Sequence, residues 1–537
     1  MKRIVCILLC LSLILVIGCE DKNSSKPIYE RDWPITNSYK SEDIKQLMIK
    51  VNTYFQENMD APTNSWDDAV YHSGNIRAFM HTGIKEFYDY SLNYAMKHHF
   101  YVNNGANTTN GDFYCISQVY IDLYRLTGKE YMLDDVFRNA DYNIEGRTAY
   151  GWVDLLYMAL PVFVDLTTIT GDNKYIDDAF RAYEKARNIM WDEEDNLWYR
   201  DSRFVFGGGH QDSVTPSGKK VYWSRGNGWA FAALAKALEY LDENHEAYTR
   251  FEKDFKLMAD ALIERQRDDG TWNANLDDPN HFGGIETSGT VMFMYGYILG
   301  IRLGILDFDK YFPIVQKIYE GVKKHAISKE GKLLYVQPGS DSPQRYHNYG
   351  NEEKRKNQTR QFAVGIFVMG LSELLLLCED YVKPEILIDE PTYTPLELPT
   401  LEINYYKGKI KAVATKQQTG NTADRIVDKR MEDIDGHRWS AEGYPSSVTL
   451  EFEEVLDLRK ITVIPYMNRS YIYTIEGSID GVSYVTIVDN KGDSFNLGFE
   501  DHEVDTKAKY IRLTVTGCKN YSGQWISINE LLVYTKN

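Results

Sequence analysis

The segment FYCISQVYIDLYRLTGKEY, residues 113–131, sets the pattern for most of the chain. Its apolar residues recur at intervals of three and four, which predicts an amphipathic helix. The helix should end at Thr127-Gly128, because glycine readily adopts the left-handed conformation that closes a helix at its C-terminus. The polar residues KEY that follow begin another helical segment.

The same turn recurs on both sides of this segment. Thr82-Gly83 is followed by IKEF and Thr170-Gly171 by DNKY, so the three glycines are 45 and 43 residues apart. That spacing accommodates two antiparallel helices with their loops, and residues 40–382 hold six to seven such hairpins. A ring closed from these hairpins buries every inner helix, whereas an open solenoid leaves two ends to be capped. We therefore predict a mainly α, closed (α/α) toroid.

A change of composition after residue 380 marks a second domain. Residues 383–405 contain four prolines, which predicts an extended, semi-rigid linker. From residue 406 to residue 537 the chain consists of short β-branched runs such as SVTLEF, KITVIPY and YIRLTVTG, separated by turn residues. This pattern is typical of an all-β sandwich.

The N-terminus predicts export and a lipid anchor. A basic start precedes an apolar run that ends in VIGC, so residues 1–18 form a lipoprotein signal peptide, Cys19 receives the lipid, and residues 19–39 form a tether. An ordinary signal peptide with an incidental cysteine is the alternative. The lipid would be the chain's only attachment to a bacterial membrane, with the protein facing the periplasm or the cell surface, and the outer membrane is the favoured location.

Charge and cysteine usage exclude several classes of function. The formal net charge of −18 argues against a nucleic-acid partner, because phosphate binding needs a basic face. Beyond the signal peptide and Cys19, the remaining cysteines, Cys115, Cys378 and Cys518, are far apart and form no CxxC pair. A disulfide framework and a zinc site are therefore not expected. His98-His99 is predicted to be a solvated helix end rather than a pair of ligands.

Two aspartates occupy equivalent positions in neighbouring hairpins. Asp112 precedes Gly128 by 16 residues and Asp154 precedes Gly171 by 17, and each comes directly before an apolar helix. Equivalent helix starts open on the same rim of a toroid, so the two carboxylates should face one another, and one should keep a proton near neutrality. The alternative is helix capping, for which Asp is a preferred residue. Asp67 has the same phase, and we interpret it as structural or as a rim contact.

The stretch VYWSRGNGWA, residues 221–230, places an arginine between two tryptophans on a glycine-rich corner. Flat rings can stack on a sugar, and the guanidinium of Arg225 can bind a carboxylate through two hydrogen bonds. Trp223 and Trp229 would then stack on the ring and its neighbour. Packing at the head of the following helix is the alternative for the tryptophans.

Four segments resemble glycoside hydrolase family 105, the unsaturated rhamnogalacturonyl hydrolases, and the related family 88. They are GWVDLLYMALP (151–161), GGGH (207–210), WSRGNGW (223–229) and ETSGTVMFMYGY (286–297). The resemblance implies an (α/α)6 barrel that acts on oligosaccharides with a 4,5-unsaturated uronic acid at the non-reducing end. In this family an aspartic acid protonates C4 of the vinyl ether, water adds at C5, and the hemiketal collapses to release the sugar.

The resemblance also implies roles for individual residues. By motif match Asp154 is the general acid and base and Asp112 the partner carboxylate, while His210, Arg225 and Trp229 belong to the pocket. Trp152 would line the site or wedge the inner helices apart. Many family members carry Trp-His-Lys shortly before the catalytic aspartate, whereas this chain has NIEGRTAYGW (143–152) with Arg147 as its only cation. That departure puts the substrate in doubt more than the chemistry.

The C-terminal part resembles the F5/8 type C, or discoidin-like, domain, which also serves as a carbohydrate-binding module. The matching segments include YPSSVTLEF (444–452), YTIEGSIDGVSY (473–484) and INELLVY (528–534). Domains of this type often hold a structural calcium ion, and no other cofactor is expected. We expect Trp439 in the core, and Trp525 either in the core or against a sugar.

These features together predict an enzyme that removes a terminal unsaturated uronate from oligosaccharides made by a lyase. Two alternatives remain open. One is a polysaccharide lyase or a conventional hydrolase on an α/α toroid. The other is a non-catalytic, surface-bound glycan-binding lipoprotein.

Overall fold

The computed structural model describes residues 33–58, 63–339, 342–344, 351–388, 401–402, 404–431, 437–466, 469–492 and 498–536. Cys19 and the predicted signal peptide lie outside the described residues, as do three of the four linker prolines. Within the described ranges, no helix combines the length and the apolar character needed to cross a membrane. The chain forms a helical domain followed by a β domain, and each is described by itself.

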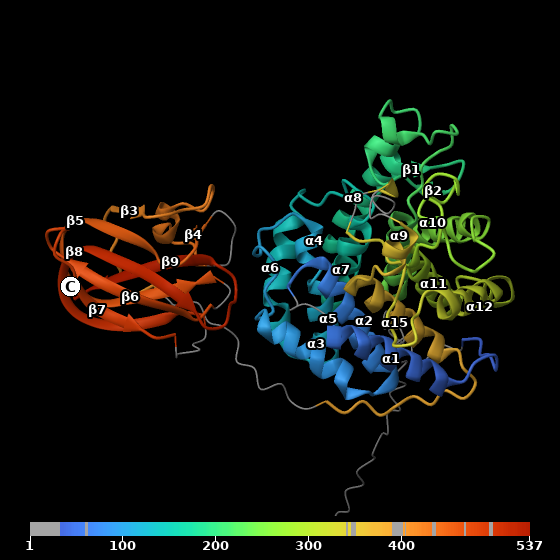
Figure 1. The fold of residues 1–537 in the computed structure, drawn as a ribbon, viewed down its shortest axis with the longest axis horizontal. Coiled ribbons are helices and arrows are strands. Elements are labelled where there is room, and N and C mark those ends of the chain that lie inside the picture. The colour runs from blue at the N-terminus through green and yellow to red at the C-terminus, as the bar shows by residue number, and fades with distance from the viewer. Residues whose placement is uncertain are drawn as a thin grey trace, which may run out of the picture. The chain divides into compact units, whose positions relative to one another are not determined.

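Six inner helices form a closed ring in the helical domain (Figure 1). Each packs against the next, and the last packs against the first. In chain order they are α2 (Trp66–Thr82), α5 (Ser117–Thr127), α7 (Leu155–Thr170), α9 (Ser224–Tyr240), α11 (Thr287–Arg302) and α15 (Gln361–Leu376). The closed ring confirms the predicted toroid.

Six outer helices alternate with the inner ones along the chain. They are α1 (Ser41–Asn58), α3 (Lys85–Lys97), α6 (Asp134–Asn143), α8 (Lys174–Met190), α10 (Glu246–Ile263) and α12 (Phe308–His325). The outer helices are amphipathic and bury one face, whereas α11 and α15 are buried on nearly every side. This difference follows from position, because a helix surrounded by others has no face left for water.

The Thr-Gly turns end three of the inner helices as predicted. Gly83, Gly128 and Gly171 have φ of 67°, 67° and 71°, the left-handed region that glycine enters without strain. Each donates its backbone N–H to a carbonyl of the preceding turn, at 2.8, 2.7 and 2.8 Å. These turns direct the chain from each inner helix into the next outer one.

Pro161 lies inside α7, yet the helix continues to Thr170. A proline has no N–H, so the carbonyl of Tyr157 loses its helical partner. The side chain of Gln118 on α5 donates to that carbonyl at 2.8 Å instead. This hydrogen bond from the neighbouring helix satisfies the carbonyl that the proline leaves without its helical partner.

The segment before α1 contacts the last inner helix. Residues 33–39, which the sequence assigns to a tether, pack against the end of α15. Trp33 donates its indole N–H to the carbonyl of Leu376 at 2.9 Å, and Thr36 forms a parallel bridge with Cys378. These two contacts join the N-terminal segment to the end of the last inner helix.

The C-terminal domain is an antiparallel β structure. Its strands are β3 (Ile410–Ala414), β4 (Trp439–Glu442), β5 (Ser446–Pro465), β6 (Tyr471–Ser478), β7 (Val485–Asn490), β8 (Glu500–Cys518) and β9 (Trp525–Thr535). The predicted strands SVTLEF and KITVIPY join into β5, with a register shift between Glu451 and Leu456. Trp439 is fully buried in the core, as expected.

Candidate active site

The long connections of the helical domain all lie at one rim, where the inner helices begin. The connections at the opposite end, from an inner helix to the next outer one, are short. The long ones span residues 98–110, 144–154, 191–223, 264–286 and 326–360. Loops of this length on a rigid scaffold commonly carry binding and catalytic groups.

Asp112 and Asp154 meet at this rim. Asp112 lies in the short helix α4 (Gly111–Tyr114), and Asp154 directly precedes α7. Burial raises the pKa of Asp112 to about 6, and the negative charge of Asp154 adds to the rise. Burial also raises the pKa of Asp154, against the opposing effects of Arg200 and Arg225. The charge of Asp154 thus reaches Asp112, and both carboxyl groups favour the protonated form more than a solvated aspartate does.

Neither carboxylate caps its helix. The N-cap of α4 is Asn110, whose side-chain oxygen accepts a hydrogen bond from the backbone N–H of Asp112 at 3.0 Å. Asp154 stands at the N-cap position of α7 but its side chain makes no capping hydrogen bond. Its Oδ2 is buried and accepts no hydrogen bond from the described residues. A buried, unsatisfied carboxylate oxygen is costly, so capping does not explain why an aspartate stands here.

Arg200 is the cation next to Asp154, and it belongs to none of the recognisable sequence motifs. Its Nε lies 3.9 Å from Asp154 Oδ2, and its Nη1 donates to Asp201 at 2.6 Å. The guanidinium carbon lies 5.6 Å from the centre of the Trp152 ring. The only sequence signal for this residue is LWYRD (197–201), where an arginine and an acid directly follow three buried residues.

The WSRGNGW segment is buried rather than open. Trp229 is inaccessible to solvent and packs against Trp66, Tyr157 and Phe362. Trp223 is 1% exposed and donates its indole N–H to the side chain of Gln337 at 2.8 Å. This differs from the prediction that both rings stack on a sugar, because neither has a face left for a ligand.

Arg225 is 1% exposed and is occupied by backbone carbonyls. Its Nη1 donates to Gln337 O at 2.5 Å and to Pro338 O at 3.0 Å, and its Nη2 donates to Pro338 O at 3.1 Å. Burial lowers its pKa to about 10. This arrangement differs from the prediction that Arg225 binds a substrate carboxylate, because its guanidinium already donates hydrogen bonds to the chain segment that follows α12. Arg225 remains close enough to lower the pKa of Asp154.

The segment instead positions the residues beside it. Asn227 accepts from the backbone N–H of Trp198 at 2.8 Å and donates to its carbonyl at 2.9 Å. This pair of bonds fixes the short strand β2 (Leu197–Trp198), from which Arg200 follows. A side chain at Gly226 would come within 2.9 Å of both Trp223 and Val153, so only glycine fits there. The recognisable motif is thus a support for Arg200 and Asp154.

Trp152 and His210 have different surroundings. Trp152 is half-buried beside Arg200, so a ring can still pack against it. His210 is exposed, and its Nδ1 accepts from the backbone N–H of Asp212 at 3.2 Å. Among the described residues it makes no hydrogen bond or ion pair with Asp112 or Asp154.

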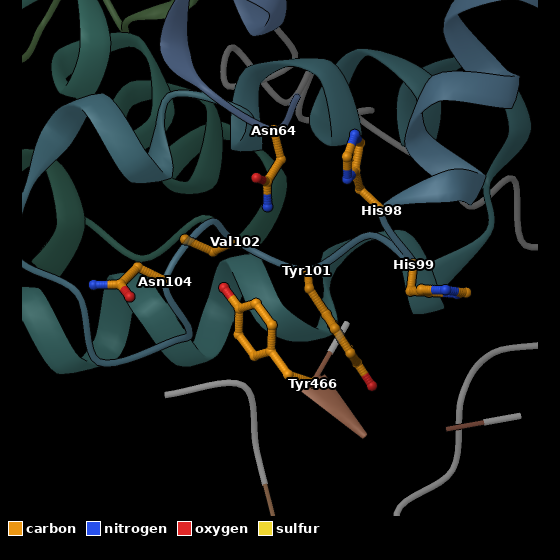
Figure 2. A pocket seen from close by; sticks show the side chains of 7 residues that line it. All are labelled: Asn64, His98, His99, Tyr101, Val102, Asn104 and Tyr466. Carbon is orange, nitrogen blue, oxygen red and sulfur yellow. The ribbon is translucent and has the colours of Figure 1, made fainter. Parts of the chain in front are cut away.

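Two other predicted residues are structural. Asp67 accepts a hydrogen bond from Gln361 at 2.9 Å, which ties α2 to α15. His98 and His99 follow α3, and their side chains point in different directions (Figure 2). His98 is 7% exposed and burial lowers its pKa to about 3, so the expectation of a solvated pair is wrong for this residue. The two rings do not form a pair of ligands.

The β domain contains a site with the chemistry of a calcium ligand set. Glu530 is inaccessible to solvent, its Oε1 has no hydrogen-bond partner among the described residues, and its Oε2 accepts from the backbone N–H of Lys429 at 3.0 Å. Burial raises its pKa to about 9, and neighbouring Asp428 adds to the rise. Calcium prefers oxygen ligands, so the unsatisfied oxygen of Glu530 fits the ion that the resemblance implies, whereas both oxygens of Asp428 are already hydrogen-bonded, to Arg430 N–H and to His437. Trp525 is half-buried, which leaves part of its ring accessible.

Comparison with known proteins identifies the family of each domain. Residues 40–378 match the family model described as Glycosyl Hydrolase Family 88, and residues 409–531 match the F5/8 type C domain. Two solved structures share the helical fold at 30% identity. One is a glycosyl hydrolase family 88 protein from Bacteroides vulgatus, with a TM-score of 0.57, covering 63% of this chain and 100% of its own. The other is described as a polysaccharide lyase, with a TM-score of 0.58, covering 64% and 99%.

Two curated relatives carry the name unsaturated 3S-rhamnoglycuronyl hydrolase. The protein from Formosa agariphila is 31% identical over 248 residues, and that from an Alteromonas species is 29% identical over 247 residues. Each match covers 46% of this chain. The matched segments span 63% and 56% of the relatives' own length, less than two thirds of either protein.

Proposed function

Since the chain belongs to Glycosyl Hydrolase Family 88, we propose that it removes a 4,5-unsaturated uronic acid from the non-reducing end of oligosaccharides. The reaction is hydration of the vinyl ether. Asp154 donates a proton to C4, and a water molecule supplies the hydroxyl group that bonds to C5. The resulting hemiketal opens, and the sugar that followed the uronate is released.

The paired acids at the rim carry this proposal. A general acid must hold a proton near the working pH and release it to the substrate. Burial raises the pKa of Asp154. Its Oδ2 has no hydrogen-bond partner among the described residues, so no neighbouring group competes with the substrate for the proton. Asp112 is near enough for the charges to interact, so it stabilises the proton on the pair and can accept one from water. A helix-capping role explains neither why the two aspartates lie at the same rim nor why their pKa values are raised.

One absorbance assay separates this function from its rivals. The protein is incubated with an unsaturated uronyl disaccharide, and the enol-ether band is followed. Hydration makes the band disappear, whereas a lyase acting on intact polymer makes it appear, as the solved relative described as a lyase would predict. A binding protein leaves the band unchanged. No loss of the band on any unsaturated substrate would rule the proposal out.

We extend to this chain the substrate class named for its two curated relatives, an unsaturated 3S-rhamnoglycuronyl unit. The 31% and 29% identities support it, and the lack of the Trp-His-Lys segment is compatible with a substrate unlike rhamnogalacturonyl. A panel of sulfated and unsulfated unsaturated disaccharides tests the assignment through kcat/KM.

We also propose that the F5/8 type C domain binds a glycan. A gel-retardation assay on the parent polysaccharide checks this, with Trp525→Ala as the variant.

We propose that Cys19 anchors the protein to a bacterial membrane, on the periplasmic or the outer face. The sequence VIGC at the end of an apolar run supports this location. When the full chain is expressed in a bacterium that processes lipoproteins, the protein should be found in the membrane fraction. Cys19→Ala should move it to the soluble fraction, and retention in the membrane would contradict the proposal.

A further inference from the structure

We propose that Arg200 binds the carboxylate of the substrate and thereby places C4 of the uronate at Asp154. The inference rests on the proposed function and assigns the substrate contact to a residue outside the recognisable motifs. Arg225, the arginine within WSRGNGW, has both terminal nitrogens bound to backbone carbonyls. Another cation at the rim must therefore meet the negative charge of a uronate.

The backbone holds Arg200 beside the acid. Its carbonyl accepts a hydrogen bond from the N–H of Val153 at 2.8 Å, one residue before Asp154. Two residues earlier, Trp198 is held by the side chain of Asn227. The position of Arg200 relative to Asp154 is thus fixed by main-chain bonds on both sides, as a substrate-positioning group requires.

The guanidinium keeps donors available. Nη1 donates to Asp201, and Nε is buried, faces Asp154 Oδ2 and has no hydrogen-bond partner. Nη2 makes no hydrogen bond to the described residues. The Arg200 side chain is 17% exposed and that of Asp154 is 14% exposed, so both can be reached from the rim. Trp152 lies beside the guanidinium and offers a flat surface for the sugar ring.

The chemistry of the substrate matches this spacing. The carboxylate is attached to C5, and C5 is bonded to C4, the carbon that receives the proton. A cation that binds the carboxylate must therefore lie within a few ångströms of the acid. The Arg200 Nε to Asp154 Oδ2 distance of 3.9 Å meets that condition.

Binding at Arg200 would also help to keep Asp154 protonated. The charged groups that face Asp154 are Arg200, Arg225, Asp112 and Asp201. A bound carboxylate neutralises Arg200, the strongest of the groups that lower the pKa of Asp154. The acid therefore holds its proton more firmly when a uronate is bound than when the site is empty.

The test compares two substrates on two variants. The unsaturated disaccharide is used as the free acid and as its methyl ester, which has no negative charge. Wild-type protein should prefer the acid by about 10- to 100-fold in kcat/KM, the range expected for hydrogen bonds to a charged group. Arg200→Ala should lose most of that preference, with the acid slowed and the ester little changed.

Arg203→Ala is the matched control. Arg203 donates to the same Asp201, through Nε at 3.0 Å and Nη2 at 2.8 Å, but its side chain is 48% exposed, against 17% for Arg200. This variant should keep the wild-type preference for the acid. Asp201 retains one arginine in either variant, so neither should unfold, and circular dichroism checks this.

The outcomes distinguish the two proposals. If wild type hydrates the acid and Arg200→Ala retains the full preference for acid over ester, Arg200 does not bind the carboxylate. If Arg203→Ala loses the preference equally, the effect belongs to Asp201 and the inference also fails. If wild type hydrates neither substrate, the proposed function itself has failed.

Discussion

The helical domain carries buried charged side chains at both ends of its inner ring and pairs them differently. In the C-terminal halves of the inner helices, Arg77 and Arg302 each contact both Glu239 and Glu373. Arg302 lies 2.6 Å from Glu239 through Nη2 and 2.6 Å from Glu373 through Nε. Two positive and two negative charges thus form a closed set, with side chains 0–8% exposed.

At the opposite rim the charges are left incompletely paired. Asp112 and Asp154 repel one another, and the arginine nearest to Asp154 stays 3.9 Å away. The closed set is expected to hold helices together, because removing one member leaves a buried charge uncompensated. The rim groups are instead kept ready to exchange a proton. The contrast suggests that stability and reactivity are assigned to separate ends of one barrel.

The largest effect should come from Asp154→Asn. Removing the general acid is expected to lower kcat by about 10²- to 10⁴-fold, measured by loss of the enol-ether band. The melting temperature should stay the same or rise, since the amide removes a buried charge with an unsatisfied oxygen. Asp67→Asn is the matched control, because Asp67 has the same helix phase but is hydrogen-bonded to Gln361. An equal loss in both variants would contradict the assignment of Asp154.

At the other end, Arg302→Met should affect stability rather than chemistry. The change leaves Glu239 and Glu373 buried with one cation between them, which is expected to cost about 3–5 kcal/mol in the free energy of unfolding. Urea denaturation measures the loss, and kcat at low temperature should be close to wild type. Lys256→Met removes an exposed pair with Glu252 and should change stability by less than about 0.5 kcal/mol. Similar costs in the two variants would disprove the special role of the closed set.

The β domain also has a buried carboxylate with an unsatisfied oxygen, that of Glu530. We expect this group to bind a metal ion, whereas Asp154 in the helical domain is expected to transfer a proton. Calcium at about 100 times its Kd should stabilise the full chain by about 2–3 kcal/mol, seen as a rise in the melting temperature of the β domain. A chelator should reverse the rise, and Glu530→Gln should abolish it. If calcium stabilises Glu530→Gln as much as wild type, Glu530 does not hold the ion.

The architecture was predictable from the sequence because it depends on local and repeated signals. The Thr-Gly turns need only the conformational freedom of glycine, so their spacing predicted the hairpins. The equal phase of Asp112 and Asp154 predicted that they share a rim, since equivalent helix starts in a ring point the same way. These inferences required no knowledge of how distant loops fold.

The surroundings of the acids were not predictable in this way. Whether Arg225 is open or buried depends on Gln337 and Pro338, which are more than a hundred residues away in the sequence. Trp229 packs on Trp66 and Phe362 from opposite ends of the domain. Arg200 belongs to no repeated pattern, and its place beside Asp154 comes from the backbone bond to Val153. Motif recognition therefore found the support of the site and missed the cation within it.

The smallest predicted effect concerns Asp112 and pH. Its pKa is raised from 3.8 to about 6 in the folded protein, so folding takes up a proton between these values. The stabilising effect of that proton is complete below about pH 4 and is lost as the pH rises through about 6. Asp112→Asn has no charge to bury, so it should be more stable than wild type at pH 7.5, by up to about 3 kcal/mol, and equally stable at pH 4. Urea denaturation at both pH values measures the difference. If the stability gain is the same at pH 4 and pH 7.5, burying the charged form of Asp112 does not cost stability. The contrast between the two ends of the barrel would then rest on Asp154 alone.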